Sequence, residues 1–179
     1  WEVAITGSGI PISLIARIAA RAAGGAEPPS VEGEADFAMT LSGFASGRPQ
    51  GVVDARLAGL AYGLIAAETG ALSGRFEGTA ADGTFELSLS LSGETSGEFD
   101  ARGGWAGGAI AGSLAAPWAN FGGFSLGEGA LEFETGGGAG LLVSGGADAA
   151  GGRIELVDGR FGAGGFKGTF STTAASAPG

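Results

Sequence analysis

Alternating acidic side chains are the first candidates in this chain for catalysis or metal binding. Glu32, Glu34 and Asp36 occupy alternate positions, and Glu132 and Glu134 repeat the pattern further along. Paired carboxylates can hydrolyse glycosides, and groups of them can bind Ca²⁺. The spacings of EF-hand and calcium-solenoid sites are absent, however, and alternating acids most often form the solvated face of a β-strand. We therefore interpret both groups as strand faces and expect no metal site.

Histidine and cysteine are both absent from the 179 residues, which removes the usual catalytic chemistry. Without cysteine there is no disulfide framework, thiolate metal site or thiol nucleophile. Without histidine a Ser-His-Asp triad cannot form within the chain. The string "GGGAGLLVSGG" lacks the Gly-Lys-Ser/Thr of a phosphate-binding loop, and "GSGIPI" lacks the dinucleotide-binding spacing. We therefore expect no cofactor and no enzymatic activity.

The charge balance bears on the choice of partners. Nineteen acidic against nine basic residues give a net charge of −10, which disfavours phosphate backbones, so we expect no nucleic-acid partner. The chain also lacks the basic patch that binds anionic lipid surfaces. It contains no apolar run of about 18 residues, as a membrane-spanning helix requires. Because it begins in a strand-like pattern, we expect an excised segment or a mature form, with any membrane anchor outside it.

The hydrophobic period changes once along the chain. Trp1, Val3 and Ile5 alternate with other residues as in a short strand, and "IPISLIARIAARAAGG" then predicts an amphipathic helix over 11–23. "AEPPS" follows as a linker, and from Val31 onward the period is two. The sequence thus predicts three parts. Residues 1–30 hold the strand, helix and linker, residues 31–173 form an antiparallel β domain, and residues 174–179 are a frayed tail.

The β part contains about nine to eleven short strands joined by glycine turns. A mean hydropathy of +0.28 argues against disorder, so the 39 glycines are interpreted as turn residues. The fold class is mainly β, an antiparallel sheet curled into a trough, with a closed barrel or sandwich as the alternative. The stretch 115–130 breaks the alternation and is predicted as a loop or edge, and 136–152 holds one weak strand. One helix cannot cover so many strands, so what covers their apolar face becomes the central question.

Aromatic residues offer the remaining candidate for binding. Trp105, Trp118, Phe121 and Phe124 could line a ligand site, or they could be ordinary core and edge packing. The sequence leaves both readings open.

The layout resembles the repeat regions of AsmA-like proteins of the bacterial envelope, particularly the TamB type. Three parts carry the resemblance: the short helix, the entry into "VEGEADFAMTLSGFASGRPQG", and the later series "ALSGRFEGTAADGTFELSLSLSG" and "GGRIELVDGRFGAGGFKGTF". Together they cover most of the chain. The resemblance implies a periplasmic trough with an apolar inner face and a polar outer face. Proteins of this family are associated with phospholipid transport between the inner and outer membranes, or with outer-membrane protein assembly.

The resemblance further implies that phospholipid acyl chains lie along the inner face, with outer-membrane assembly proteins as further partners. The lipid-groove candidates are the apolar inward positions of the strands. They are Phe37, Met39, Leu41, Val53, Leu57, Leu72, Phe76, Phe85, Leu87, Leu89, Leu91, Phe99, Ile110, Leu114, Leu131, Phe133, Ile154, Leu156, Phe166 and Phe170.

Two other functions remain open at this point. "GRFEGTAADG" and "GFKGTFSTTAA" faintly resemble the barrels of transferrin-binding surface lipoproteins, which implies a closed, secreted binding module. A strand-rich structural spacer, such as an adhesin stalk, would also fit the composition. An open trough predicts bound lipid or dye, whereas a tightly closed domain predicts neither.

Overall fold

The computed structural model describes residues 2–22, 30–63, 65–135, 141–149, 151–162 and 165–174. Within these ranges the chain forms strands, one α-helix and one turn of 3₁₀ helix. In chain order the elements are β1 (Val3–Pro11), α1 (Ile12–Ala22), β2 (Glu32–Ser42), η1 (Phe44–Ser46), β3 (Gln50–Tyr62), β4 (Ile65–Gly78), β5 (Asp82–Ser92), β6 (Thr95–Ala106), β7 (Ala109–Phe121), β8 (Phe124–Thr135), β9 (Leu141–Ala149), β10 (Gly152–Gly162) and β11 (Gly165–Ala174).

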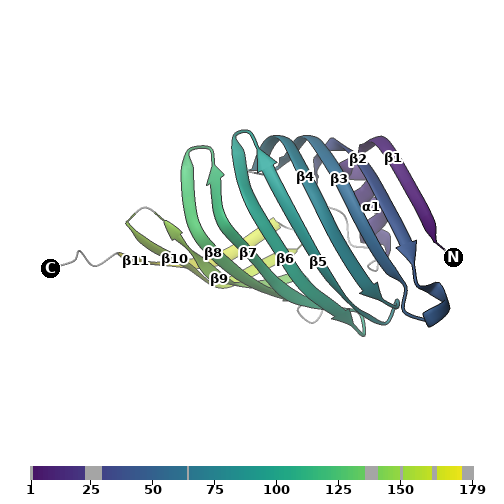
Figure 1. Ribbon diagram of the computed structural model, residues 1–179. Helices are drawn as coiled ribbons and strands as arrows, with labels where there is room; N and C mark the ends of the chain where they lie inside the picture. The colour runs from purple at the N-terminus through teal and green to yellow at the C-terminus, as the bar shows by residue number, and fades with distance from the viewer. Residues whose placement is uncertain are drawn as a thin grey trace.

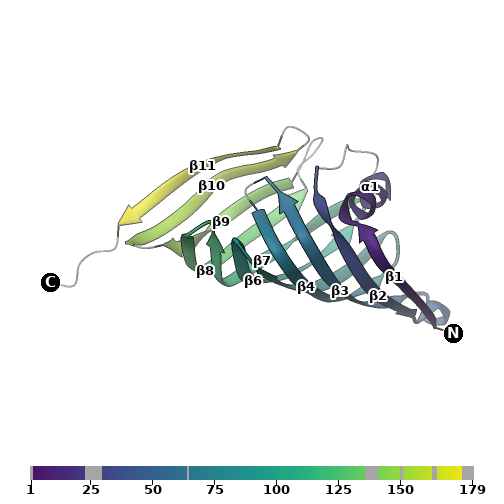
Figure 2. The same ribbon diagram turned by 90° about the horizontal axis from the view of Figure 1, so that it is seen from above.

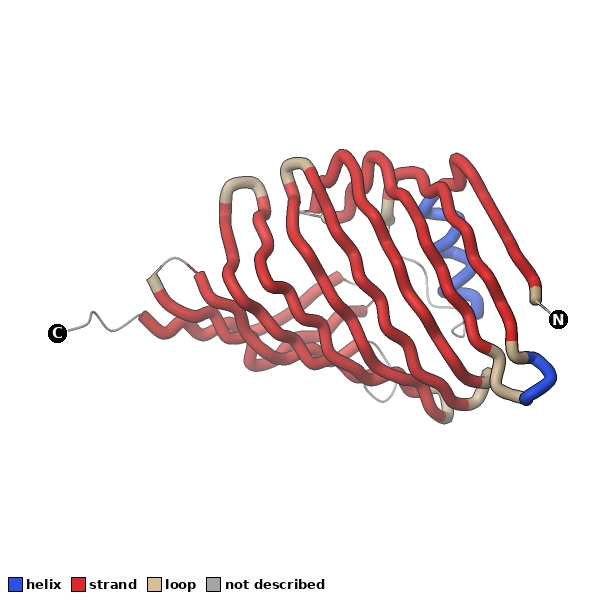
Figure 3. The backbone as a smooth tube through the Cα atoms, in the orientation of Figure 1, coloured by secondary structure: helices blue, strands red, loops and turns tan. Residues whose placement is uncertain are grey.

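The strands of the described residues form one antiparallel sheet in simple sequence order (Figure 1, Figure 3). Each strand pairs with the strand before it and the strand after it, from β1 to β11. The mainly β fold and the predicted strand number are confirmed. Because β1 and β11 are the two edges of the sheet, it stays open, and the alternative of a closed barrel or sandwich is wrong.

The inner face of the sheet is built from apolar residues in register. Leu87 of β5 lies opposite Ala101 of β6, Ala101 lies opposite Leu114 of β7, and Leu114 lies opposite Leu131 of β8. Residues directly opposite in an antiparallel pair point to the same face, so this row crosses four strands on one side of the sheet. The alternation seen in the sequence therefore becomes a continuous apolar surface.

The outer face carries the polar half of the same alternation. One row runs through Arg75, Glu86, Arg102, Ser113 and Glu132 on successive strands β4 to β8. The Arg75 Nε–H donates a hydrogen bond to the Glu86 carboxylate at 2.8 Å. All five positions are exposed or half-exposed to solvent, as the solvated-face interpretation of the acidic residues expects.

The sheet curls strongly toward its apolar side. Figure 2 shows β9, β10 and β11 turned back so that they face the middle strands. The accessible surface of the chain is 11070 Å². A compact monomer of 17.2 kDa exposes about 7,800 Å². The large surface reflects a single curved layer with an open side.

Full burial is rare on the inner face. Among the described residues the buried apolar side chains are Ala35, Ala67, Leu91, Ala119 and Leu156, three of which are alanines. A closed two-layer domain buries many large side chains, because each layer covers the other. Here the large inner residues are mostly half-buried. Curvature alone covers them partly, and the trough keeps accessible apolar surface.

The helix α1 follows β1 directly and lies on the side toward which the sheet curls. It spans Ile12–Ala22, close to the predicted 11–23, and contacts β1 and β2. In Figure 1 it lies behind β2 and β3. Within the described residues no helix has the length and apolar character needed to cross a bilayer. The predicted linker after the helix lies mostly outside the described residues.

The N-terminal strand belongs to the same sheet as the rest. β1 pairs with β2 from Val3↔Leu41 to Pro11↔Glu34, so the segment assigned to residues 1–30 contributes an edge strand to the β domain. At the other end β11 continues to Ala174, and the predicted tail beyond it lies outside the described residues.

The stretch 115–130 is strand, and its prediction as a loop or edge is wrong. It comprises the end of β7, a turn at Gly122 and Gly123, and the start of β8. Two β-bulges explain the broken alternation. Glu98 and Asp100 of β6 pair with Trp118 and Ala115 of β7, so β7 carries one extra residue, and β8 carries another between Leu126 and Gly129. A bulge shifts the inward positions by one residue, so a strict alternation assigns the residues beyond it to the wrong face.

Candidate functional site

The inner face encloses a cavity of about 670 Å³ between the middle and C-terminal strands. Side chains from β4 through β11 line it, and its exposed lining is entirely apolar. The volume lies within the usual range for small-molecule sites, about 300–1,000 Å³. Leu114 and Leu131 lie near one another on its floor, while Leu156 comes from the strands that curl over it. The curl thus converts part of a sheet face into a cavity with an apolar lining.

The turn between β7 and β8 forms one border of the cavity. Phe121 and Phe124 pair across Gly122 and Gly123, and both rings line the cavity. Phe124 is 52% exposed, so the apolar lining reaches the surface there.

One polar residue belongs to the lining without presenting a polar group to it. Thr95 is fully buried, and its Oγ1 accepts a hydrogen bond from the Ala66 N–H at 3.0 Å. This bond joins β4 to β6, beyond the end of β5 at Ser92. Thr95 is 0% exposed, so its hydroxyl presents no polar surface to the cavity.

Nine of the twenty lipid-groove candidates line this cavity. They are Leu89, Leu91, Phe99, Leu114, Leu131, Phe133, Ile154, Leu156 and Phe170. Their contact with lipid stays a prediction.

The remaining candidates lie away from the cavity. Nine cover strands β2 to β5 and are half-buried: Phe37, Met39, Leu41, Val53, Leu57, Leu72, Phe76, Phe85 and Leu87. Ile110, 39% exposed, lies at the start of β7. The side chain of Phe166 lies outside the described residues.

Several lining residues were absent from the lipid-groove candidates, although Phe121 and Phe124 were among the aromatic candidates for a ligand site. Ala116, Ala119, Phe121, Phe124 and Leu126 come from the stretch whose alternation the two bulges interrupt. The signal that could have found them is the pair of phenylalanines flanking Gly122-Gly123. Two aromatic residues separated by two glycines are typical of a tight hairpin with both rings on one face.

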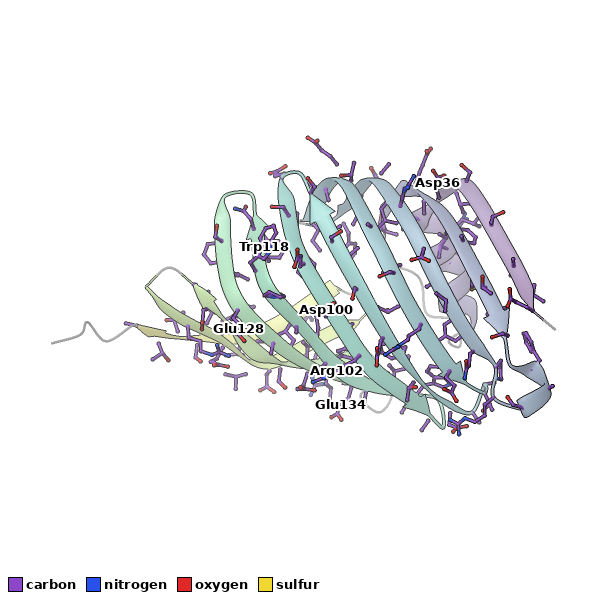
Figure 4. The ribbon with its side chains drawn as sticks, viewed as in Figure 1. Asp36, Asp100, Arg102, Trp118, Glu128 and Glu134 are labelled. Carbon is purple, nitrogen blue, oxygen red and sulfur yellow. The ribbon has the colours of Figure 1, made fainter. Side chains whose placement is uncertain are left out.

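The two tryptophans of the aromatic group have different surroundings. Trp105 is half-buried on the inner face, and its indole N–H donates to the Thr79 carbonyl oxygen at 2.8 Å. Trp118 lies opposite Glu98 on the outer face and is 44% exposed (Figure 4). Phe121 and Phe124 line the cavity, so the ligand-site reading fits the phenylalanines and not the tryptophans.

The outer face carries a polar groove of about 610 Å³ across β2 to β6. It runs between two rows of side chains, with Asp36 and Glu98 on one row and Asp54 and Asp100 on the other. Figure 4 shows Asp36 and Asp100 on this face, turned to the viewer. Ser88 donates a hydrogen bond to Asp100 at 2.5 Å. Among the described residues no group of acids gathers as a metal site would require.

The most clearly perturbed carboxylate fastens the edge of the sheet. The Ser8 hydroxyl and the Gly9 N–H donate to Asp36 Oδ1 at 2.6 and 2.7 Å. These bonds, the Ser8 bond foremost, lower the pKa of Asp36 because they favour its charged form. The two donors lie in the bulge where β1 breaks register with β2, so Asp36 holds that bulge in place.

Comparison of the chain with known protein families, with curated proteins and with solved structures found no match in any of the three. The function proposed below therefore rests on the geometry of the cavity and on the resemblance in sequence.

Proposed function

We propose that the inner face of this sheet binds the acyl chains of lipids and that the chain is a lipid-carrying segment of a cell-envelope protein. The observation that carries the proposal is the cavity of about 670 Å³ whose exposed lining is entirely apolar. An acyl chain needs apolar surface and no directional polar contact. The lining of this cavity exposes apolar surface and no polar group.

The energetics favour a long, flexible apolar ligand. Each methylene moved out of water contributes about 0.8 kcal/mol, so ten contribute about 8 kcal/mol before the entropic cost of binding. A polar headgroup finds no partner inside the cavity, since the exposed lining is entirely apolar. The headgroup then stays in water beside Phe124, at the exposed border of the lining.

The finer part of the proposal comes from the resemblance to AsmA-like proteins. On that basis the segment works in the bacterial periplasm and helps to move phospholipid between the inner and outer membranes, or supports outer-membrane protein assembly. It acts as a binding surface without catalysis. The net charge of −10 suits a carrier that does not adhere to anionic lipid surfaces through a basic patch.

A dye-binding assay with two matched variants tests the proposal. Leu131→Asp places a carboxylate in the middle of the cavity, whereas Val52→Asp places one on the outer face, where Val52 is 53% exposed. Burying a charge without a partner is costly, so Leu131→Asp should weaken binding of an apolar fluorescent dye and of palmitate about tenfold or more. Val52→Asp should bind like the wild type, and circular dichroism should show the same strand content in all three.

Mass spectrometry of organic extracts gives the second measurement. Wild-type protein purified without detergent should carry lipid, and Leu131→Asp should carry less. Wild-type protein that binds neither dye nor palmitate and yields no lipid would overturn the proposal. A purely structural role would become the better account.

A further inference from the structure

Two phenylalanine rings meet across the inner face at one level of the sheet. Phe85 of β5, Gly103 of β6, Gly112 of β7 and Phe133 of β8 form a single register row. The centroids of the two rings are 6.4 Å apart and their planes are inclined by 19°, so the rings stack. Large residues thus stand at both ends of the row and glycines at its two middle positions.

The stack depends on the curl of the sheet and on the two glycines. Strands lie about 4.8 Å apart, so three spacings span about 14 Å in a flat sheet, far beyond ring contact. A Cβ built on Gly103 would lie 3.0 Å from Phe85 Cζ, and one built on Gly112 would lie 2.8 Å from Phe133 Cζ. Each ring therefore leans over a glycine, in space that a larger residue would fill.

The stack lies at a boundary of the apolar cavity. Phe133 lines the cavity, but Phe85, which stacks on it, does not. Beyond the stack the inner face continues through Trp105 and Ile110, which pair with each other and also lie outside the cavity lining. On β5 to β8 the two rings consequently separate the cavity from the apolar surface near the β6–β7 turn, whereas on β9 the lining continues through Val143, which pairs with Phe133, to Leu141 one row beyond the stack.

We propose that the Phe85–Phe133 stack is a partition that ends the cavity over β5 to β8 and limits the length of an acyl chain that lies along these strands. This inference rests on the proposed lipid-binding function and adds a determinant of specificity to it. A chain entering beside Phe124 runs along Leu114 and Leu131 and stops against the stacked rings. Removal of one ring joins the cavity to the apolar surface beyond, so that a longer chain can continue along the inner face.

A series of saturated fatty acids, from octanoate to lignocerate, tests the partition, because the path along β8 from Phe124 to Phe133 is roughly 30 Å and exceeds the length of stearate. Each further methylene that enters the cavity should raise affinity about fourfold. For the wild type the affinity should rise with chain length and then level off, at the length where the chain reaches the stack. For Phe85→Ala the rise should continue to longer acids. Phe85→Leu keeps an apolar side chain but removes the stacking, and should give an intermediate limit.

Phe76→Ala is the matched control. Phe76 lies directly opposite Phe85 on β4 and is half-buried on the same face, but it belongs to neither the stack nor the cavity lining. This variant should keep the wild-type limit. Equal limits for Phe85→Ala and wild type would overturn the partition while leaving lipid binding intact. A wild type that binds none of the acids would overturn the proposed function itself.

Discussion

The strands β2–β5 and the strands β6–β10 share the same alternation but form different surfaces. From β3 to β5 the pairing runs in continuous register, and the inner positions alternate between large residues such as Leu72 and glycines such as Gly74. From β6 onward the inner positions also include glycines, such as Gly103 and Gly112, but bulges interrupt β7 and β8. The first region is an amphipathic wall that borders the cavity only through Ile65, Leu89 and Leu91. The second region curls over the cavity.

The difference shows what alternation alone can and cannot specify. Large apolar residues on every second position make one face hydrophobic, but they also fill the space into which a sheet would bend. Small inner residues open that space in both regions, and in the second region the bulges of β7 and β8 add local twist and bend the strands. The glycines that look like turn residues in the sequence are therefore partly residues of the inner face, and they permit the curvature.

Truncation of one leucine in each region should give the largest contrast. Leu156 is 8% exposed within the curled region, and Leu72 is half-buried in the wall. Leu156→Ala should lower the free energy of unfolding by about 2–4 kcal/mol, because it leaves a void among packed neighbours. Leu72→Ala should lower it by about 1 kcal/mol, since solvent already reaches that side chain. Urea unfolding followed by circular dichroism measures both, and equal losses would contradict the distinction between the two regions.

Filling an inner glycine should test the origin of the curl. A Cβ at Gly112 would lie 2.4 Å from the Arg102 carbonyl oxygen and 2.8 Å from Phe133 Cζ, so Gly112→Ala should destabilise the protein by about 1–3 kcal/mol. Gly127→Ala is the control, because its Cβ would approach Asp148 Cβ at 3.3 Å, where small adjustments suffice, and should change stability by about 0.5 kcal/mol or less. The same urea titration compares them. A tolerated Gly112→Ala would mean that the curl does not depend on this close approach.

The smallest expected effect is on the stability of the N-terminal edge. Hydrogen bonds to Asp36, and not buried apolar side chains, hold this edge. The pKa of Asp36 lies below its ordinary value of 3.8. The contribution of this carboxylate to stability is thus complete at neutral pH and disappears as the pH falls through the lowered pKa. Asp36→Asn should speed amide hydrogen exchange at Gly9 relative to wild type at neutral pH. That difference should shrink on acidification below about pH 4, as the wild-type carboxylate is protonated.

Exchange in β6 to β10 provides the internal control for that experiment. Amides such as those of Leu114 and Leu131 lie far along the sheet from Asp36, so their rates should be the same in Asp36→Asn and wild type. Faster exchange throughout the sheet would show that the N-terminal edge and the curled region open together. The contrast between them would then have no energetic basis.

The sequence predicted the elements better than their curvature. Period-two alternation predicts the strands, and the apolar periodicity of residues 11–23 predicts α1. Because one short helix is too small to cover so many strands, the sequence also indicates that one face of the sheet stays uncovered. The stretch around Trp118 was misread because bulges reverse which residues face inward. A strict period of two cannot account for the inserted residue of a bulge, so it assigns the wrong face to the residues that follow.

The cavity was harder to predict than the face that forms it. The alternation placed Leu114, Leu131 and Phe133 on the inner side, and all three line the cavity. The same alternation placed Phe37 and Phe76 on the inner side, although neither of them lines the cavity. Which part of an apolar face becomes enclosed depends on the cumulative bend over many strands, and thus on long-range register that no short window contains. The stack of Phe85 on Phe133 arises from this bend.

Paramagnetic broadening by a spin-labelled stearate tests the location of the bound chain most directly. With the label near the methyl end of the fatty acid, the account predicts broadened amide resonances at Leu114, Leu131 and Gly129. Resonances of β3, such as that of Val52, should stay sharp, because no described residue of β3 lines the cavity. Broadening at Val52 without broadening at Leu131, or no broadening at saturating ligand, would contradict the claim that the cavity on the inner face carries lipid.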